Sequence, residues 1–166
     1  VARELAARKM RAPSAVIGSG RGPPHVTDPD PSMVGMSDAE MKEELARMGS
    51  PLNDKMGQDF VRQQLNLLRS DSGLGDTVQA AEPRIQVPLL AYFGKDERGN
   101  VTADFVRRWA ELAASPELFT LRLFPGDHFY LLDDKVDFVP TLLKDLDAVL
   151  LGTALAGASV SEATAV

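Results

Sequence analysis

Residues 119–130 read Phe119-Thr120-Leu121-Arg122-Leu123-Phe124-Pro125-Gly126-Asp127-His128-Phe129-Tyr130, and this stretch decides the fold. Its apolar side chains alternate through Phe119, Leu121 and Leu123, a pattern that predicts a strand. A turn containing Pro and Gly follows the strand and carries His128. Because an imidazole titrates near neutral pH, a histidine just beyond a strand end is well placed for proton transfer. We therefore predict that His128 is a general base.

Two carboxylates follow an earlier apolar stretch. Residues 87–93 predict a second strand, which ends in Gly94-Lys95-Asp96-Glu97. Thr102 is the better candidate to cap the next helix, so neither Asp96 nor Glu97 is needed for that role. An acid that accepts a hydrogen bond from the imidazole fixes its tautomer and stabilises its charged form. Either side chain can do this.

Strand-like and helical patterns alternate along the chain. Strand patterns at 14–18, 87–93 and 119–124 are separated by helical patterns, which predicts an α/β fold with a parallel sheet. The carboxyl ends of parallel strands meet at one edge of the sheet. We therefore expect Asp96 and His128 to approach each other at that edge. Helices are predicted at 1–11, from a capping box at Ser37–Glu40 onward, at 54–69, at 103–114 and at 136–151.

The order strand, acid, helix, strand, histidine is the second half of the serine, acid, histidine order of a hydrolase relay. In that relay the serine lies within a Gly-x-Ser-x-Gly turn, and no serine of this sequence has that context. Ser19 lies between Gly18 and Gly20, but the glycine spacing differs. We interpret these residues as a turn that closes the first strand.

The composition argues against several classes of function. A net charge of −6 argues against nucleic acid and anionic membranes as partners. The absence of cysteine excludes disulfides and thiolate nucleophiles, and two widely spaced histidines argue against a metal site. A single domain in a reducing, cytoplasmic setting fits these numbers. Val1 stands in helical register without a capping residue, so we expect the chain to be the later part of a larger protein.

The methionines are unevenly distributed. Five of the six lie between residues 33 and 56. Methionine is flexible and polarizable, and two interpretations stay open: core filling between two helices, or a lid over a groove for acyl chains. Residues 153–166 are rich in Ala, Ser and Thr, and we predict that this tail is disordered.

Several of these stretches, taken in order, resemble one family. They are residues 1–5, the segment from Ser19 to His25, the helix that begins at Ser37, Trp109 in the penultimate helix, and the segment from Phe124 to Leu132. Together they resemble the type II thioesterases of polyketide and nonribosomal peptide assembly lines, and the related medium-chain fatty-acyl thioesterases. The resemblance runs from residue 1 to about 151.

The resemblance implies the C-terminal portion of an α/β-hydrolase fold, with three parallel strands, flanking helices and a helical lid at about 33–69. It implies hydrolysis of acyl thioesters from carrier-protein phosphopantetheine by a Ser-His-Asp relay. The serine would lie before Val1, so this chain alone is expected to be inactive. No metal or organic cofactor is implied. The implied partner is an acyl or peptidyl carrier protein, whose pantetheine arm would enter under the lid.

The resemblance also bears on the catalytic residues. His128 matches the family's catalytic histidine. The family's aspartate usually stands three residues after a glycine, which here is Glu97, whereas Asp96 stands two residues after it. We favour Asp96 because the family uses an aspartate, and Glu97 is the alternative.

Two other functions stay open at this point. One is another α/β-hydrolase with the same relay, such as an esterase or a dehalogenase-like enzyme. The other is a non-catalytic remnant or interaction module.

Overall fold

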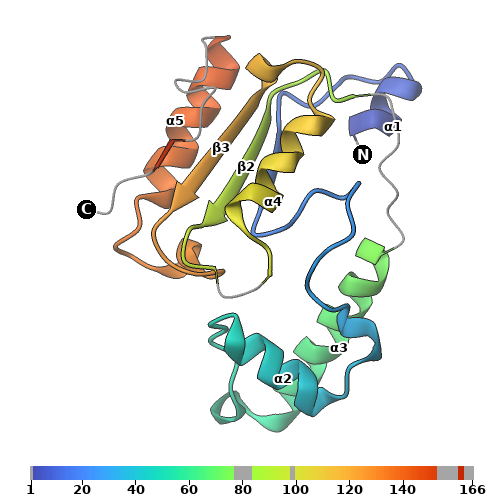
Figure 1. Ribbon diagram of the computed structural model, residues 1–166, viewed down its shortest axis with the longest axis vertical. Coiled ribbons are helices and arrows are strands. Elements are labelled where there is room, and N and C mark those ends of the chain that lie inside the picture. Colours follow the sequence, from blue (N-terminus) through green and yellow to red (C-terminus); the bar gives the residue numbers. More distant parts are fainter. Residues whose placement is uncertain (1, 77–83, 98–99, 153–160, 163–166) are drawn as a thin grey trace.

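The structure, a computed structural model, describes residues 2–76, 84–97, 100–152 and 161–162. Its centre is a sheet of four parallel strands in the order β1-β2-β3-β4, which confirms the predicted α/β class (Figure 1). The strands are β1 (Val16–Ser19), β2 (Leu89–Gly94), β3 (Phe119–Phe124) and β4 (Ser161–Glu162). The last of these lies within the tail that was predicted to be disordered, and the other residues of that tail lie outside the described part of the chain.

The register of the sheet brings the functional turns together. Gly94 at the end of β2 pairs with Phe124 at the end of β3, so the two strands finish side by side. On the other side of β2, Ser19 at the end of β1 pairs with Tyr92, so β1 also ends near this edge. The turns that follow these three strands therefore emerge at one edge, as the sequence predicts.

Both faces of the central strands are covered. The helix α5 (Phe138–Leu151) packs on one face, over Leu90, Tyr92 and Phe124. The other face is covered by α4 (Ala103–Arg107) and the 3-10 helix that continues it (Arg108–Leu112). Because successive side chains of a strand point to opposite faces, β2 is buried along its whole length.

A buried ion pair fixes α5 on the sheet. Arg122 of β3 lies 2.7 Å from Asp145 of α5, and the Tyr92 hydroxyl donates a hydrogen bond of 2.9 Å to the same carboxylate. Burial and the contact with Asp145 raise the pKa of Tyr92, so this phenol stays protonated. Because a buried charge without a partner is costly, the pair holds α5 in one register over the two strands that end at the site.

A helical segment, residues 33–76, is inserted between β1 and β2; it contains the predicted lid at about 33–69 and is called the lid below. It contains α2 (Asp38–Arg47) and α3 (Gln58–Asp76), and Figure 1 shows both beyond the carboxyl ends of β2 and β3. The predicted capping box is confirmed, because Ser37 accepts from the Glu40 backbone N–H while the Glu40 carboxylate accepts from the Ser37 N–H. The lid has its own apolar cluster, formed by Met41, Leu45, Val61 and Leu65.

Three methionines of the lid pack inward, whereas Met56 is exposed. Met41 is fully buried between α2 and α3, and Met33 and Met36 pack against the same cluster. For these three residues the packing supports the core-filling interpretation. The physical reason is that two short helices can bury an apolar stripe only against each other.

The boundaries of several helices differ from the prediction. The first helix, α1 (Ala2–Ala7), is shorter than the predicted 1–11, and Lys9 has a left-handed φ of 54°. The helix α3 continues seven residues past its predicted end at residue 69, and residues 77–83 lie outside the described part. Gly152 has a φ of 63° and ends α5, as predicted. No helix within the described ranges is long and apolar enough to cross a membrane.

Candidate active site

His128 lies in the turn that follows β3. Gly126 opens this turn with a φ of 101°, a conformation that side chains with a Cβ rarely adopt. The Asp127 carboxylate accepts a hydrogen bond of 3.0 Å from the Phe129 N–H, and the Asp127 carbonyl accepts one of 3.1 Å from the Tyr130 N–H. These local bonds give the turn one shape and direct the imidazole away from the strand.

Glu97 is the acid in contact with the imidazole. Its Oε1 lies 3.2 Å from Nδ1 of His128. The Glu97 side chain is only 5% exposed, whereas that of His128 is 29% exposed. The hydrogen bond to Glu97 raises the pKa of His128 above its ordinary value, and burial of the ring opposes this. Because Nδ1–H donates to Glu97, Nε2 is the nitrogen of the neutral ring that can accept a proton.

Asp96 has a different position. Its carboxylate accepts a hydrogen bond of 2.9 Å from the Gly126 N–H, and its own N–H donates one of 3.0 Å to the Gly126 carbonyl. Asp96 thus connects the turn after β2 to the turn after β3. The structure brings Glu97, and not Asp96, to the imidazole, because the paired backbones hold the Asp96 side chain against Gly126.

Two glycines allow the turns to pack this closely. A Cβ at Gly94 would lie 2.2 Å from the Asp127 carbonyl oxygen, so the backbone of the histidine turn crosses directly over the end of β2. A Cβ at Gly20, which has a φ of 63°, would lie 3.2 Å from Cε1 of His128. The imidazole is therefore held between the end of β1 on one side and Glu97 on another.

Ser19 lies at the same edge but is engaged elsewhere. Its hydroxyl is 2.7 Å from the hydroxyl of Tyr130. Burial raises the pKa of Tyr130 to about 12, so the phenol is protonated at neutral pH. Among the residues that the structure describes, no serine hydroxyl is hydrogen-bonded to His128. Within the described ranges, the candidate base and the candidate acid therefore meet without a serine hydroxyl in contact with them.

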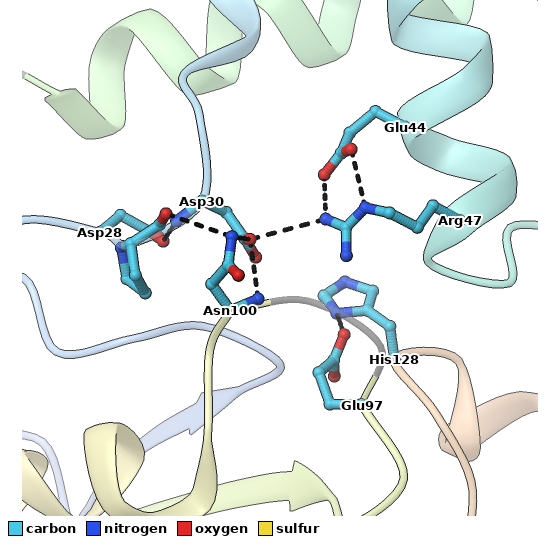
Figure 2. Close-up of polar contacts among 8 residues, drawn as sticks. Asp28, Asp30, Glu44, Arg47, Glu97, Asn100 and His128 are labelled. Atoms are coloured by element: carbon cyan, nitrogen blue, oxygen red, sulfur yellow. Dashed lines mark hydrogen bonds and ion pairs between the residues drawn. The ribbon is translucent and has the colours of Figure 1, made fainter.

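An ionic cluster connects the lid to this edge (Figure 2). Arg47, the last residue of α2, donates from Nε to Glu44 at 2.9 Å and lies 3.5 Å from the Asp30 carboxylate. The same Asp30 oxygen accepts hydrogen bonds from the backbone and side-chain nitrogens of Asn100, at 2.9 and 3.0 Å. Asp30 thus joins the lid to the segment that follows Glu97.

The cluster is electrically coupled to the acid and the base. The Glu44 hydrogen bond is the main cause of a raised pKa at Arg47, and the charges of Asp30 and Glu97 add to it. Figure 2 shows Arg47 and Glu97 on opposite sides of the imidazole. No sequence pattern predicts this cluster, because its members come from three segments far apart in the chain.

The described residues contain no group of three or more His, Cys, Asp or Glu side chains arranged to hold a metal ion. The chemistry that this edge offers is proton transfer at Nε2 of His128. The Glu97 carboxylate, 3.2 Å from Nδ1, is placed to orient the ring and to stabilise the imidazolium that proton transfer would produce.

The chain as a whole is similar to several known proteins. A family model described as a thioesterase domain matches residues 1–149. The gramicidin S biosynthesis protein GrsT of Aneurinibacillus migulanus is 26% identical over 152 residues, which cover 90% of this chain and 58% of that protein. The chain therefore spans little more than half the length of this curated relative.

Two solved structures have the same fold. The type II thioesterase BorB from the borrelidin biosynthetic cluster matches with a TM-score of 0.69 and 26% identity, over 89% of this chain and 58% of that one. The RedJ thioesterase from the prodiginine pathway of Streptomyces coelicolor matches with a TM-score of 0.74 and 24% identity, over 90% and 57% of the two chains. The second likeness concerns the fold alone.

Proposed function

The chain belongs to the thioesterase domain family, and on that premise we propose that it supplies the base and the acid of an enzyme that hydrolyses acyl thioesters. The observation that carries the proposal is the contact of 3.2 Å between Glu97 and His128. This contact lies at the carboxyl edge of a parallel sheet, where α/β enzymes place their sites.

We assign His128 as the base. A serine hydroxyl attacks the thioester carbonyl carbon, and its proton passes to Nε2 of His128. The carbon–sulfur bond then breaks, and the thiol leaves with the proton that the imidazole returns. In the second half of the reaction, His128 takes a proton from water as the water oxygen attacks the ester carbonyl carbon. The bond from that carbon to the serine oxygen then breaks, the imidazole returns the proton to the serine, and the acid is released.

We assign Glu97 as the relay acid. Its buried carboxylate accepts from Nδ1–H, keeps the imidazole in one tautomer and stabilises the imidazolium. Asp96, the acid that the sequence favours by residue type, then has a supporting role, because its carboxylate braces Gly126. The position three residues after Gly94 supports the choice of Glu97.

We propose that the nucleophilic serine lies ahead of Val1, as the family resemblance implies. Two observations support this: Ser19 is hydrogen-bonded to Tyr130, and GrsT is matched over only 58% of its length. The Ser-His-acid relay is then complete only together with that further segment.

We further propose that the substrate is an acyl group on the phosphopantetheine arm of an acyl or peptidyl carrier protein. The relatives named for gramicidin S and borrelidin biosynthesis support this choice of substrate. The arm would reach Nε2 of His128 under the lid, close to the contact between Arg47 and Asp30. The cytoplasmic setting expected from the cysteine-free sequence is part of the same proposal.

The test uses the product of the complete coding region that contains this chain. It is incubated with carrier protein loaded with acetyl or aminoacyl groups, and the released pantetheine thiol is measured. We expect turnover that His128→Ala abolishes and that Glu97→Gln lowers by on the order of 10⁴-fold, the cost of losing a relay acid in a serine protease. Asp96→Asn is the matched control, with a smaller loss.

The 166-residue chain by itself serves as a second test. Loss of the serine from a complete relay costs about a million-fold in kcat, so we expect no measurable turnover and no labelling by a fluorophosphonate probe. Robust turnover by this chain, abolished by His128→Ala, would contradict the assignment of the nucleophile. Hydrolysis of simple esters but not of carrier thioesters by the complete product would favour the esterase alternative.

A further inference from the structure

The hydroxyl pair of Ser19 and Tyr130 joins two parts of the chain that are far apart in sequence. The oxygens are 2.7 Å apart, and neither residue belongs to the relay. Tyr130 is only 1% exposed, and its ring stacks on Phe124 with centroids 5.0 Å apart and an interplanar angle of 7°. The ring is therefore fixed in the core, while the hydroxyl reaches the end of β1.

The end of β1 is fixed to β2 by strand pairing and a backbone hydrogen bond. Ser19 is in register with Tyr92, and the Gly20 N–H donates a hydrogen bond of 3.0 Å to the Tyr92 carbonyl. A Cβ at Gly20 would lie 3.2 Å from Cε1 of His128 and 3.6 Å from each ring nitrogen. The backbone at Gly20 therefore lies against the part of the imidazole that carries both nitrogens.

The histidine turn, which is the turn after β3 that carries His128, must be held in position relative to β1 and Glu97. His128 and Tyr130 are two residues apart in one compact turn, which the bond from the Tyr130 N–H to the Asp127 carbonyl closes. A displacement of Tyr130 therefore moves His128 relative to Glu97. We propose that Ser19 and Tyr130 are positioning residues for His128. The hydrogen bond between their hydroxyls holds the histidine turn against β1, so that Nδ1 of His128 meets Glu97.

This inference rests on the proposed function only in naming His128 as the base. A measurement on His128 itself can therefore test it without turnover. The charged groups around the ring are Glu97, Asp127, Asp30 and Arg47, which come from the turns, the segment before the lid and α2. Removing the hydroxyl of Ser19 or Tyr130 changes none of these charges, because both hydroxyls are neutral at neutral pH.

The experiment is an NMR titration of the full chain that follows the imidazole Hε1 and ring nitrogen signals of His128. It compares the wild type with Ser19→Ala, Ser19→Thr and Tyr130→Phe, and His25 is the internal control. We expect Ser19→Ala and Tyr130→Phe to lower the pKa of His128 toward the ordinary value of about 6.5, because the contact with Glu97 weakens. The ring nitrogen shifts should also report loss of the single Nδ1–H tautomer.

The conservative variant separates positioning from packing. Ser19→Thr keeps a hydroxyl and should retain the wild-type titration, while the signals of His25 should not change in any variant. If Ser19→Ala and Tyr130→Phe lower the melting temperature but leave the pKa and the tautomer of His128 unchanged, the pair is only structural and the inference is overturned. Absence of thioester hydrolysis by the complete coding-region product would reject the proposed function and leave this titration result as it stands.

Discussion

The substitution Gly94→Ala tests the arrangement of the two turns most directly. Gly94 ends β2, and its added Cβ would lie 2.2 Å from the Asp127 carbonyl oxygen and 2.7 Å from that of Gly126. Both obstacles are backbone atoms, so no side chain can rotate out of the way. To bring the first contact from 2.2 Å to the 3.0 Å that real Cβ atoms respect, the histidine turn must move by about 0.8 Å.

That displacement is large compared with the tolerance of the contact between acid and base. Nδ1 of His128 lies 3.2 Å from Oε1 of Glu97, and a separation of about 3.6 Å is no longer a hydrogen bond. If the histidine turn moves along the line that joins these two atoms, half of the required displacement of about 0.8 Å is enough to break their hydrogen bond. Overpacking of this kind typically costs about 1–3 kcal/mol of unfolding free energy, and we expect Gly94→Ala to lose an amount in this range.

The assays are urea denaturation, which gives the free energy of unfolding, and an NMR titration of His128. The matched control is Gly35→Ala, because a Cβ at Gly35 meets no atom within 4 Å and the backbone there is not left-handed. We expect the control to unfold as the wild type does or slightly later, and to leave the titration unchanged. Equal stability of the two variants, with His128 titrating as in the wild type, would refute the close crossing of the histidine turn over β2.

Three further predictions concern the acid, the lid contact and the lid core. Glu97→Gln should lower the pKa of His128, whereas Asp96→Asn should mainly lower stability. The pKa of His128 is raised in the folded wild type, so the stability lost in Glu97→Gln should be largest below about pH 6.5 and should shrink as the pH rises through the raised pKa. Denaturation at several pH values measures this dependence. Asp30→Asn weakens the contact with the lid, so backbone hydrogen exchange should become faster in α2 while the sheet is unaffected. Met41→Ala empties a fully buried site and should destabilise the lid helices by about 2–5 kcal/mol, which backbone hydrogen exchange detects as faster exchange in α2 and α3. An equal loss of protection in β2 and β3 would contradict a separate lid core.

The sheet and its functional edge could be predicted from the sequence because their patterns are local. The strand at 119–124 agrees with the structure to the residue, and the strand at 87–93 agrees within two residues at each end. Apolar alternation, the turn residues and the chain order were enough to place His128 and the pair of acids at one edge.

The end of α3 could not be predicted because a tertiary contact decides it. Ser70, Gly73 and Gly75 indicate a loop, yet the helix continues to Asp76. The hydroxyl of Ser72 accepts a hydrogen bond of 3.2 Å from the Met33 N–H, which ties the last turns of the helix to the start of the lid. Contacts of this kind outweigh the intrinsic propensity of a few glycines.

The choice between Asp96 and Glu97 shows a second limit. Both residues were candidates, and the residue type favoured one while the spacing from Gly94 favoured the other. Which carboxylate reaches the imidazole depends on the pairing of Asp96 with Gly126, thirty residues later in the chain. The contact between Asp30 and Arg47 was beyond sequence reasoning for the same reason, since it depends on how the lid lies over the edge.

The insertion of the lid between β1 and β2 has a consequence for how such a chain can evolve. The lid carries its own apolar cluster, and the strands on either side of it, β1 and β2, are paired in register with each other. The entropy of closing a loop rises by only about 0.6 kcal/mol for each doubling of its length, so helices can be lengthened or exchanged there at little cost to the sheet. An exchanged lid needs to keep the contacts it makes at this edge, which include the ion pair of Arg47 with Asp30 and the close approach of Gly49 to the Asp127 carboxylate, while His128 and Glu97 lie outside the insert. Variation in what the proposed site admits can therefore accumulate in one insert, while the residues proposed to move the proton stay the same.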